Sequence, residues 1–129
     1  MIARWGLTIG PDVVVCEGRV LLGSAYRANN FIGRFLGLML CSRLAEDEAL
    51  WLSHCRSVHT FGMRFAIDVL FLDAGGTIAR IVPNLTPGRF ANCPGAHHTV
   101  ELASGAAGRL QLSVGQTLVM QEPAQTASG

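Results

Sequence analysis

The chain has 129 residues, of which 50% are hydrophobic and 15% charged, and its formal net charge at pH 7 is +1. This length fits one domain with a core of its own, and the large apolar share excludes an intrinsically disordered chain. The near-neutral charge gives no support to nucleic-acid binding through a broad basic field, and the chain has no run of about 18 apolar residues that could span a membrane.

The first predicted elements are a β-hairpin and a helix. Two apolar runs, residues 13–15 and 20–22, flank Glu17-Gly18-Arg19 and predict a short hairpin. Between residues 28 and 40, apolar side chains recur at the spacing of one helix face, which predicts a short helix. Arg34 lies at the edge of this apolar stripe.

The strongest pattern in the chain is an alternation with a period of two that begins at Phe61. The odd positions from Phe61 to Phe71 are all large and apolar, which predicts a β-strand over this segment. Its second half is apolar on both faces, as in a central strand of a sheet. The glycines of residues 73–76 allow the positive φ angles of a hairpin turn after the strand.

The remaining elements are predicted to be short. The acidic residues 45–49 predict a loop, residues 84–95 contain two prolines and predict a loop without regular structure, and residues 104–110 predict one or two helical turns capped by Ser104. Short strands are expected at residues 50–52, 77–82, 98–102 and 117–120. Together these elements predict a single β-rich domain over residues 1–122 and a flexible tail over residues 123–129.

The segment CRSVHTFGMRFAIDVLFLD, residues 55–73, resembles the signature of a known family. The family is uncharacterised, occurs in bacteria and archaea, and is called domain of unknown function 192 or uncharacterised protein family 0127. Three flanking motifs agree with the resemblance, namely residues 34–39, 100–102 and 112–115. The resemblance covers nearly all of the predicted domain.

The resemblance implies a mainly β fold, a small β-barrel or sandwich with one or two short helices, and no established reaction. Two positions depart from the family pattern: Ala66 stands where the family usually has Pro, and an arginine that usually follows Gly-Leu-Met directly comes later here, at Arg43. Many relatives resemble envelope proteins, which implies an envelope-associated location. The start of this chain lacks the apolar stretch of a signal peptide, so the sequence as written predicts a cytoplasmic protein.

The leading functional hypothesis is a non-catalytic binding module. Arg64 and Asp68 are four residues apart on the predicted strand, so they share one face, where they either form a salt bridge or receive an anion. For His59 and Thr60, hydrogen bonds to loop backbone are the alternative to a ligand contact. The predicted mouth of the barrel, which would recognise a small polar ligand or a partner segment, is lined by His59, Thr60, Arg64, Asp68, Arg34 and Glu101.

The cysteines leave several interpretations open. Cys55 and His59 supply the residue types of a nucleophile and its base, so a hydrolase or transferase is the alternative function, with Cys55 and Cys93 as reactive thiols. Cys55 and His59 with Cys93, His97 and His98 could close a zinc site, and the two cysteines could form a disulfide. Buried free thiols are the plainest interpretation, because the spacing is not that of a common zinc finger.

No motif in the chain indicates a cofactor or a metal. The sequence contains no GxSxG, HExxH, P-loop or dinucleotide-binding motif. We therefore expect no cofactor, no metal and no nucleic-acid partner. A structural role in an assembly is a third possibility, and an exposed apolar patch formed by Trp51 and Phe90 would favour it.

Overall fold

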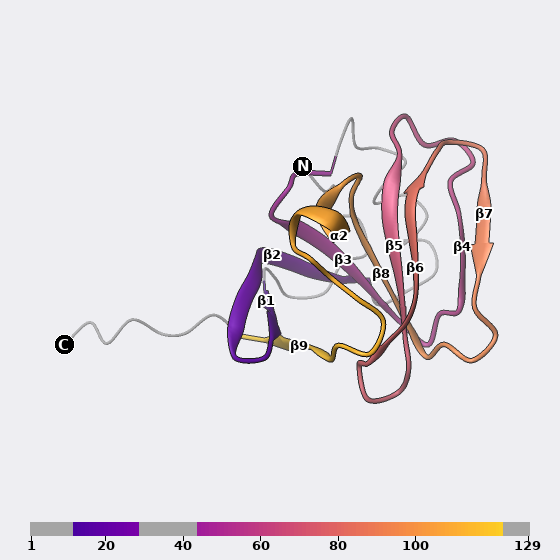
Figure 1. The fold of residues 1–129 in the computed structure, drawn as a ribbon. Coiled ribbons are helices and arrows are strands. Elements are labelled where there is room, and N and C mark those ends of the chain that lie inside the picture. The colour runs from indigo at the N-terminus through magenta and orange to yellow at the C-terminus, as the bar shows by residue number, and fades with distance from the viewer. Residues whose placement is uncertain (1–11, 29–43, 123–129) are drawn as a thin grey trace.

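The computed structural model describes residues 12–28 and 44–122, in which strands dominate (Figure 1). The elements are β1 (Asp12–Cys16), β2 (Arg19–Ala28), β3 (Glu48–Ser53), β4 (Ser57–His59), β5 (Ile67–Leu72), β6 (Ile78–Leu85), β7 (Phe90–Asn92), β8 (His98–Ala103), α2 (Ala106–Arg109) and β9 (Leu118–Gln121). Seven strands form a main sheet in the order β6-β5-β8-β3-β2-β1-β9, and β4 and β7 form a separate small sheet. The described residues confirm a mainly β fold.

The predicted hairpin at the start of the domain is confirmed. Glu17 and Gly18 at its tip have positive φ angles of 50° and 78°, which match the twist of a two-residue hairpin turn. β2 then runs on to Ala28 and pairs in parallel with β3, with Tyr26 opposite Leu50. The predicted helix that follows, including Arg34, lies outside the described residues from residue 29 onward.

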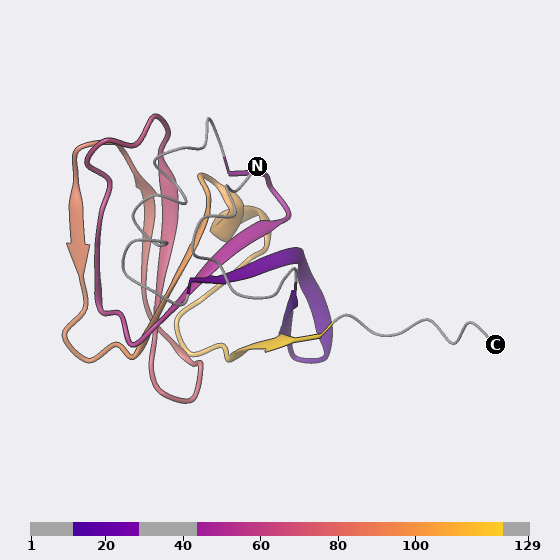
Figure 2. The ribbon, with the colours of Figure 1, turned by 180° about the vertical axis from the view of Figure 1, so that it is seen from behind.

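The main sheet curls until its two edge strands meet at one end, near the turn between β5 and β6 (Figures 1 and 2). Thr77, just before β6, forms an isolated bridge with Thr117, just before β9. The amide of Leu118 donates to the carbonyl of Gly76 at 2.9 Å, and the amide of Ile78 donates to the carbonyl of Gln116 at 2.8 Å. Farther along, β6 and β9 are not paired in the described residues, so the sheet is an open barrel.

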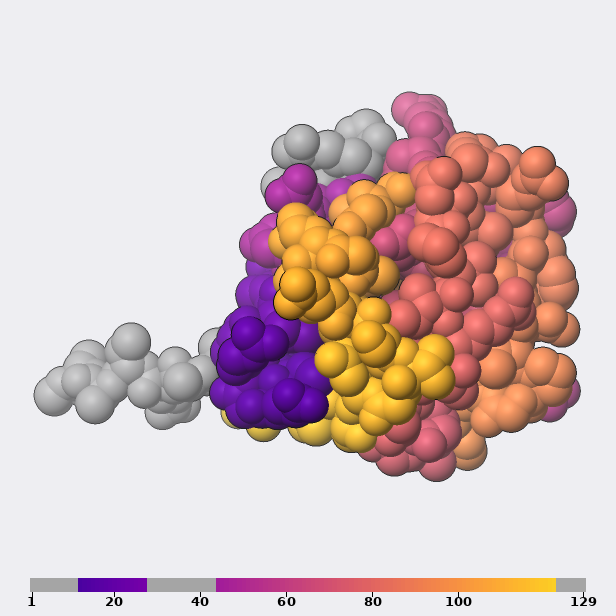
Figure 3. Space-filling model, in the orientation of Figure 1, coloured from indigo at the N-terminus to yellow at the C-terminus, as the bar shows by residue number. Residues whose placement is uncertain are grey.

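The main sheet has an apolar core on each face. β5 is buried along its whole length and contributes alternate residues to the two cores, as expected for a central strand. The small sheet covers one of the two cores, called core 1, through Val58 and Ala91. The helix α2 covers the other, called core 2, through Ala106 and Ala107. In the space-filling view, α2 and the residues after it lie between the β1–β2 hairpin and β6 (Figure 3). Core 1 includes Leu50, Leu52, Ile67, Val69 and Phe71, and core 2 includes Trp51, Leu70, Leu72, Val100 and Leu102.

The prediction of one continuous strand from Phe61 to Phe71 is wrong in its first half. β5 begins only at Ile67, because the chain turns between Thr60 and Met63, where the Met63 amide donates to the Thr60 carbonyl at 3.2 Å. Gly62 has a φ of 81° in this turn. Phe61 is exposed, whereas Met63 packs against core 1. In this half of the pattern Met63 and Phe65 pack against the core, but they lie outside the strands.

Two predicted loops contain strand structure. Residues 84–95 include β7, which pairs antiparallel with β4, and the chain remains in β6 as far as Leu85. Three-residue strands next to prolines carry too short a pattern to be recognised. The loop predicted at residues 45–49 ends two residues earlier than expected, since β3 begins at Glu48. The strands predicted at residues 50–52, 77–82, 98–102 and 117–120 are confirmed, with ends that differ by at most two residues except at β6, which continues three residues beyond its predicted end.

The helical turn after β8 is present, but Ser104 does not cap it. Gly105, with a φ of 90°, precedes the helix and no side chain caps it. The hydroxyl of Ser104 instead donates to the side-chain oxygen of Asn84 at 2.7 Å. This bond ties the start of the α2 turn to the end of β6.

Candidate functional site

The residues predicted to line one mouth do not gather at one place. Asp68 on β5 is paired with Leu102 on β8, while Glu101 on β8 is paired with Val69 on β5. Because adjacent residues of a strand point to opposite faces, Asp68 and Glu101 lie on opposite sides of the main sheet. Glu101 is 5% exposed and faces core 1. Arg34 lies outside the described residues.

Asp68 is a buried anchor for backbone. It is 1% exposed, and its two carboxylate oxygens accept the amides of Asn84 at 2.8 Å and Ala107 at 2.9 Å. Asn84 has a φ of 49°, a conformation that non-glycine residues rarely adopt. Among the described residues no ion pair joins Asp68 to Arg64, which is exposed in the turn before β5. Asp68 therefore holds together β5, the end of β6 and α2.

Thr60 directly follows β4 and joins this end of the small sheet to the turn between β6 and β7. Its side chain is fully buried, and its hydroxyl donates to the Thr86 carbonyl at 2.6 Å and accepts the Arg89 amide at 2.8 Å. Its own amide donates to the Arg89 carbonyl at 2.9 Å. These are the hydrogen bonds to loop backbone that the sequence left open as the alternative to a ligand contact.

Thr60→Val is expected to lower the free energy of unfolding by about 1 to 3 kcal/mol, because the Arg89 amide and the Thr86 carbonyl lose their partner at a fully buried side chain. The measurement is urea denaturation. Thr117→Val is a suitable control, since the Thr117 hydroxyl also makes a hydrogen bond, to Thr77, but at an exposed site. Equal stability losses in the two variants would contradict a buried clamp at Thr60.

Cys55 and His59 are not placed as a nucleophile and its base. The Cys55 thiol is buried in core 1 and donates to the carbonyl of Ser57 at 3.1 Å. On β4, Val58 is buried against core 1 while His59 is exposed on the other face. His59 thus faces away from core 1, which contains the Cys55 thiol.

The described cysteines are free thiols. Cys93 is half-buried and packs against core 1, which also contains Cys55. The structure has no disulfide between these two cysteines. Burial and the carboxylate of Glu17 raise the pKa of the Cys16 thiol, which disfavours its reactive thiolate. In the described ranges, no group of three or more His, Cys, Asp and Glu residues is placed to hold a metal ion.

Three histidines meet at the lower end of the main sheet, and we call them the histidine cluster: His54, His97 and His98. The ring of His97 lies 5.4 Å from those of both His54 and His98, and the rings of His54 and His98 are 6.3 Å apart. The indole of Trp51 lies 5.6 Å from His98. Sequence reasoning noted His97 and His98 but missed His54, because only the pairing of Ser53 with His98 brings these segments together.

Exposed aromatic side chains gather on the outer face of the small sheet. His59 on β4 is directly opposite Phe90 on β7. The ring of His59 also stacks on Phe61, with centroids 5.2 Å apart and an interplanar angle of 24°. Phe61 is 54% exposed and Phe90 60%, whereas Trp51 is only 8% exposed. The exposed apolar patch was predicted to contain Trp51 and Phe90. In the structure it contains Phe90 and Phe61, because Trp51 is buried.

The segment that contains the small sheet carries an excess of exposed positive charge. Between His54 and His98 the only acidic residues are Asp68, which is buried, and Asp73, which is exposed, whereas the arginines of this segment are all exposed. Three of these arginines form hydrogen bonds at the small sheet. The backbone carbonyls of Arg89 and Arg56 accept the amides of Thr60 and Cys93, and the guanidinium of Arg80 donates to the carbonyl of Asn92. The four arginines are Arg56, Arg64, Arg80 and Arg89.

The comparison with known families identifies the chain's relatives. The family described as Uncharacterized ACR, DUF192, matches residues 17–120. The chain belongs to the DUF192 family. No curated protein matches the sequence.

Two solved structures share the fold of this DUF192 chain. A putative transcription regulator from Sinorhizobium meliloti 1021 is 25% identical, with a TM-score of 0.72 over 84% of this chain and 90% of that one. A protein of unknown function from Novosphingobium aromaticivorans DSM 12444 is 17% identical, with a TM-score of 0.74 over 88% of this chain and 91% of that one. Within the described residues, no helix is long and apolar enough to cross a membrane.

The DUF192 signature segment, residues 55–73, divides into parts with different roles. Cys55, Thr60 and Asp68 are buried and serve the fold through backbone hydrogen bonds. His59 and Arg64 are exposed. Only the exposed residues of the predicted set are thus accessible to a partner, and they belong to the outer face of the small sheet and the turn beside it.

Proposed function

We propose that this DUF192 protein is a non-catalytic binding module that recognises an acidic, extended segment of a partner protein on the outer face of the small sheet. The observation that carries the proposal is the exposed aromatic group of His59, Phe61 and Phe90, together with four exposed arginines and one exposed carboxylate in the segment from His54 to His98. Exposed aromatic side chains supply contact area, and the arginines supply charge complementarity and bidentate hydrogen bonds to carboxylates.

The position of the aromatic side chains supports a protein partner. Both strands of the small sheet are edge strands, and each turns its alternate residues outward. An extended chain that lies along such a sheet places every second side chain against it. Acidic side chains of that chain would then meet Arg64 and Arg89, and apolar ones would meet Phe61 and Phe90.

A nitrogen-15 NMR titration with a short synthetic peptide in which Glu alternates with Phe tests the proposal. We expect amide shift changes at residues 57–61 and 89–92, which weaken as salt is added because the charges are exposed. Phe90→Ala and Arg64→Gln are each expected to reduce the affinity about tenfold.

Matched controls separate this surface from general stickiness. Val114→Ala removes another exposed apolar side chain and Arg19→Gln another exposed arginine, both away from the small sheet, and both should leave the affinity unchanged. Shift changes elsewhere, or none, would overturn the proposal. The Sinorhizobium neighbour is described as a putative transcription regulator, so oligothymidylate is the comparison probe. Tighter binding of this DNA on the same residues would replace the protein partner with a nucleic acid.

A further inference from the structure

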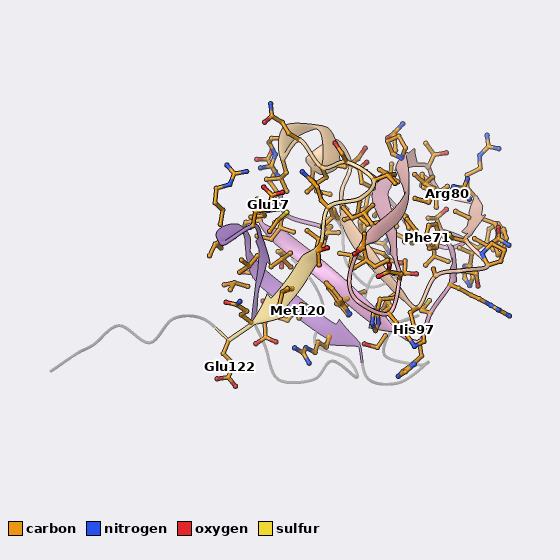
Figure 4. The ribbon with its side chains drawn as sticks, turned by 60° about the horizontal axis from the view of Figure 1, so that its bottom comes forward. Glu17, Phe71, Arg80, His97, Met120 and Glu122 are labelled. Atoms are coloured by element: carbon orange, nitrogen blue, oxygen red, sulfur yellow. The ribbon has the colours of Figure 1, made fainter. Side chains whose placement is uncertain are left out.

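Two chain segments connect the small sheet to the main sheet at the lower end of the main sheet, and each of them contains a histidine. Residues 54–56 lead from β3 to β4, and residues 93–97 lead from β7 to β8. His54 lies in the first connection and His97 in the second, with ring centroids 5.4 Å apart. His98 begins β8 and completes the histidine cluster. Figure 4 views the molecule from this end and labels His97.

A few backbone hydrogen bonds hold the two connections closed. The Cys55 amide donates to the carbonyl of His97 at 3.1 Å, and the Cys93 amide donates to the carbonyl of Arg56 at 2.8 Å. The His97 amide donates to the carbonyl of Leu72 on β5 at 2.7 Å. His54 has a φ of 55°, so the first connection is also in a conformation that L residues rarely adopt.

The environment of His98 favours its neutral form. Burial, followed by the neighbouring His97 and His54, lowers its pKa, while a hydrogen bond with the backbone of Ala74 and the charge of Asp73 oppose the shift. Nδ1 of His98 is buried and has no hydrogen-bond partner in the described part of the chain. A proton added there would place an unpaired N–H donor in the interior.

We propose that the histidine cluster is an acid-sensitive hinge that controls how firmly the small sheet is held to the main sheet. With the three imidazoles neutral, their rings pack together and both connections stay closed. With two or three of them protonated, like charges face each other across the connections, and among the described residues Asp73 is the carboxylate that opposes this repulsion at His98. The connections then open. This hinge depends on the packing of the cluster and is independent of what, if anything, the small sheet binds.

The direction of the effect follows from the lowered pKa. An imidazole in the unfolded or opened chain takes up a proton near its ordinary pKa of about 6.5. His98 in the closed junction resists protonation until the pH is lower. The closed junction is therefore fully stable above about pH 6.5 and loses stability as the pH falls below that value, until His98 itself becomes protonated.

Native-state hydrogen exchange of single amides tests the hinge in the unliganded protein. After correction for the intrinsic exchange rates, the opening equilibrium of the Cys55, Cys93 and His97 amides is expected to rise about tenfold between roughly pH 7.5 and 5.5. The amides of Met63 and Gly88 at the other end of the small sheet should change little. An equal rise at both ends would indicate global unfolding and overturn the hinge.

Histidine variants show whether the cluster is the cause. His97→Gln and His98→Gln should each reduce the acid effect to about threefold or less. The chain has four histidines, and His59, outside the cluster, supplies the control His59→Gln, which should keep the tenfold rise. His97 is exposed, so its variant remains informative if His98→Gln destabilises the fold. A full acid response in His97→Gln, or none in the wild type, would overturn the proposal.

Discussion

Gly76→Ala is expected to lower the free energy of unfolding by about 3 to 5 kcal/mol. Gly76 has a φ of 87°, and a Cβ added to it would collide with the carbonyl oxygen of Leu118. The carbonyl of Gly76 accepts the Leu118 amide at 2.9 Å, a bond that joins the two edges of the main sheet. The backbone of β9 would have to move away, and the closure of the barrel at this end would be lost with it.

Two other glycines separate the causes of this loss. Gly75→Ala in the same turn meets only an ordinary contact, with the Asp73 carboxylate at 3.5 Å, and should cost less than about 1 kcal/mol. Gly88 has a φ of 79° but open space around it, so Gly88→Ala should cost about 1 to 2 kcal/mol from backbone conformation alone. Chemical denaturation of the three variants gives the comparison. A Gly76→Ala protein no less stable than Gly88→Ala would contradict the close approach of β9.

Asp68→Ala is expected to lower the free energy of unfolding by about 2 to 5 kcal/mol. The substitution leaves the part-buried amide of Asn84 and the buried amide of Ala107 without their acceptors. Asp68→Asn retains one acceptor oxygen and turns an NH₂ group toward the second amide, so its cost should be smaller, about 1 to 3 kcal/mol. Urea denaturation at a fixed pH of about 8 measures both losses.

Asp73 is the matched control for Asp68. Its Oδ1 also accepts two backbone amides, those of Gly75 and Thr77, but at an exposed site where water can replace the bonds. Asp73→Ala should therefore cost only about 1 kcal/mol. If Asp68→Ala were as mild as Asp73→Ala, Asp68 would not be a structural anchor, and its interpretation as a ligand-binding residue would regain support.

Local patterns in the sequence were sufficient for much of the fold. The hairpin of β1 and β2 follows from two apolar runs around Glu17 and Gly18, which adopt the positive φ angles that the turn requires. β5 and the turn after it follow from an apolar run and from Gly75-Gly76. β4 and β7 were missed because each has three residues, too few to show a period.

The candidate site was predicted less well, because polarity alone does not distinguish a ligand-binding residue from a structural one. Thr60 and Asp68 are polar residues in an apolar segment, and both accept hydrogen bonds from backbone amides that are distant in the sequence. His59 is the residue of that segment for which exposure on the outer face agrees with the predicted binding role. Phe61 and Phe90 lie beside it on this face. From the sequence, Phe61 was assigned to a strand and Phe90 to an apolar assembly patch, so neither was predicted to belong to the binding site.

The sequence by itself determined the β-rich class, the family, the main hairpin turns and the central strand, since these depend on residues that are close together in the chain. Only the tertiary structure decided which distant residues meet: His59 with Phe90 across the small sheet, and His54 with His97 across its two connections. The physical reason is strand register. A shift of one residue in the pairing of two strands sends every side chain to the opposite face, and that register is set by contacts far apart in sequence.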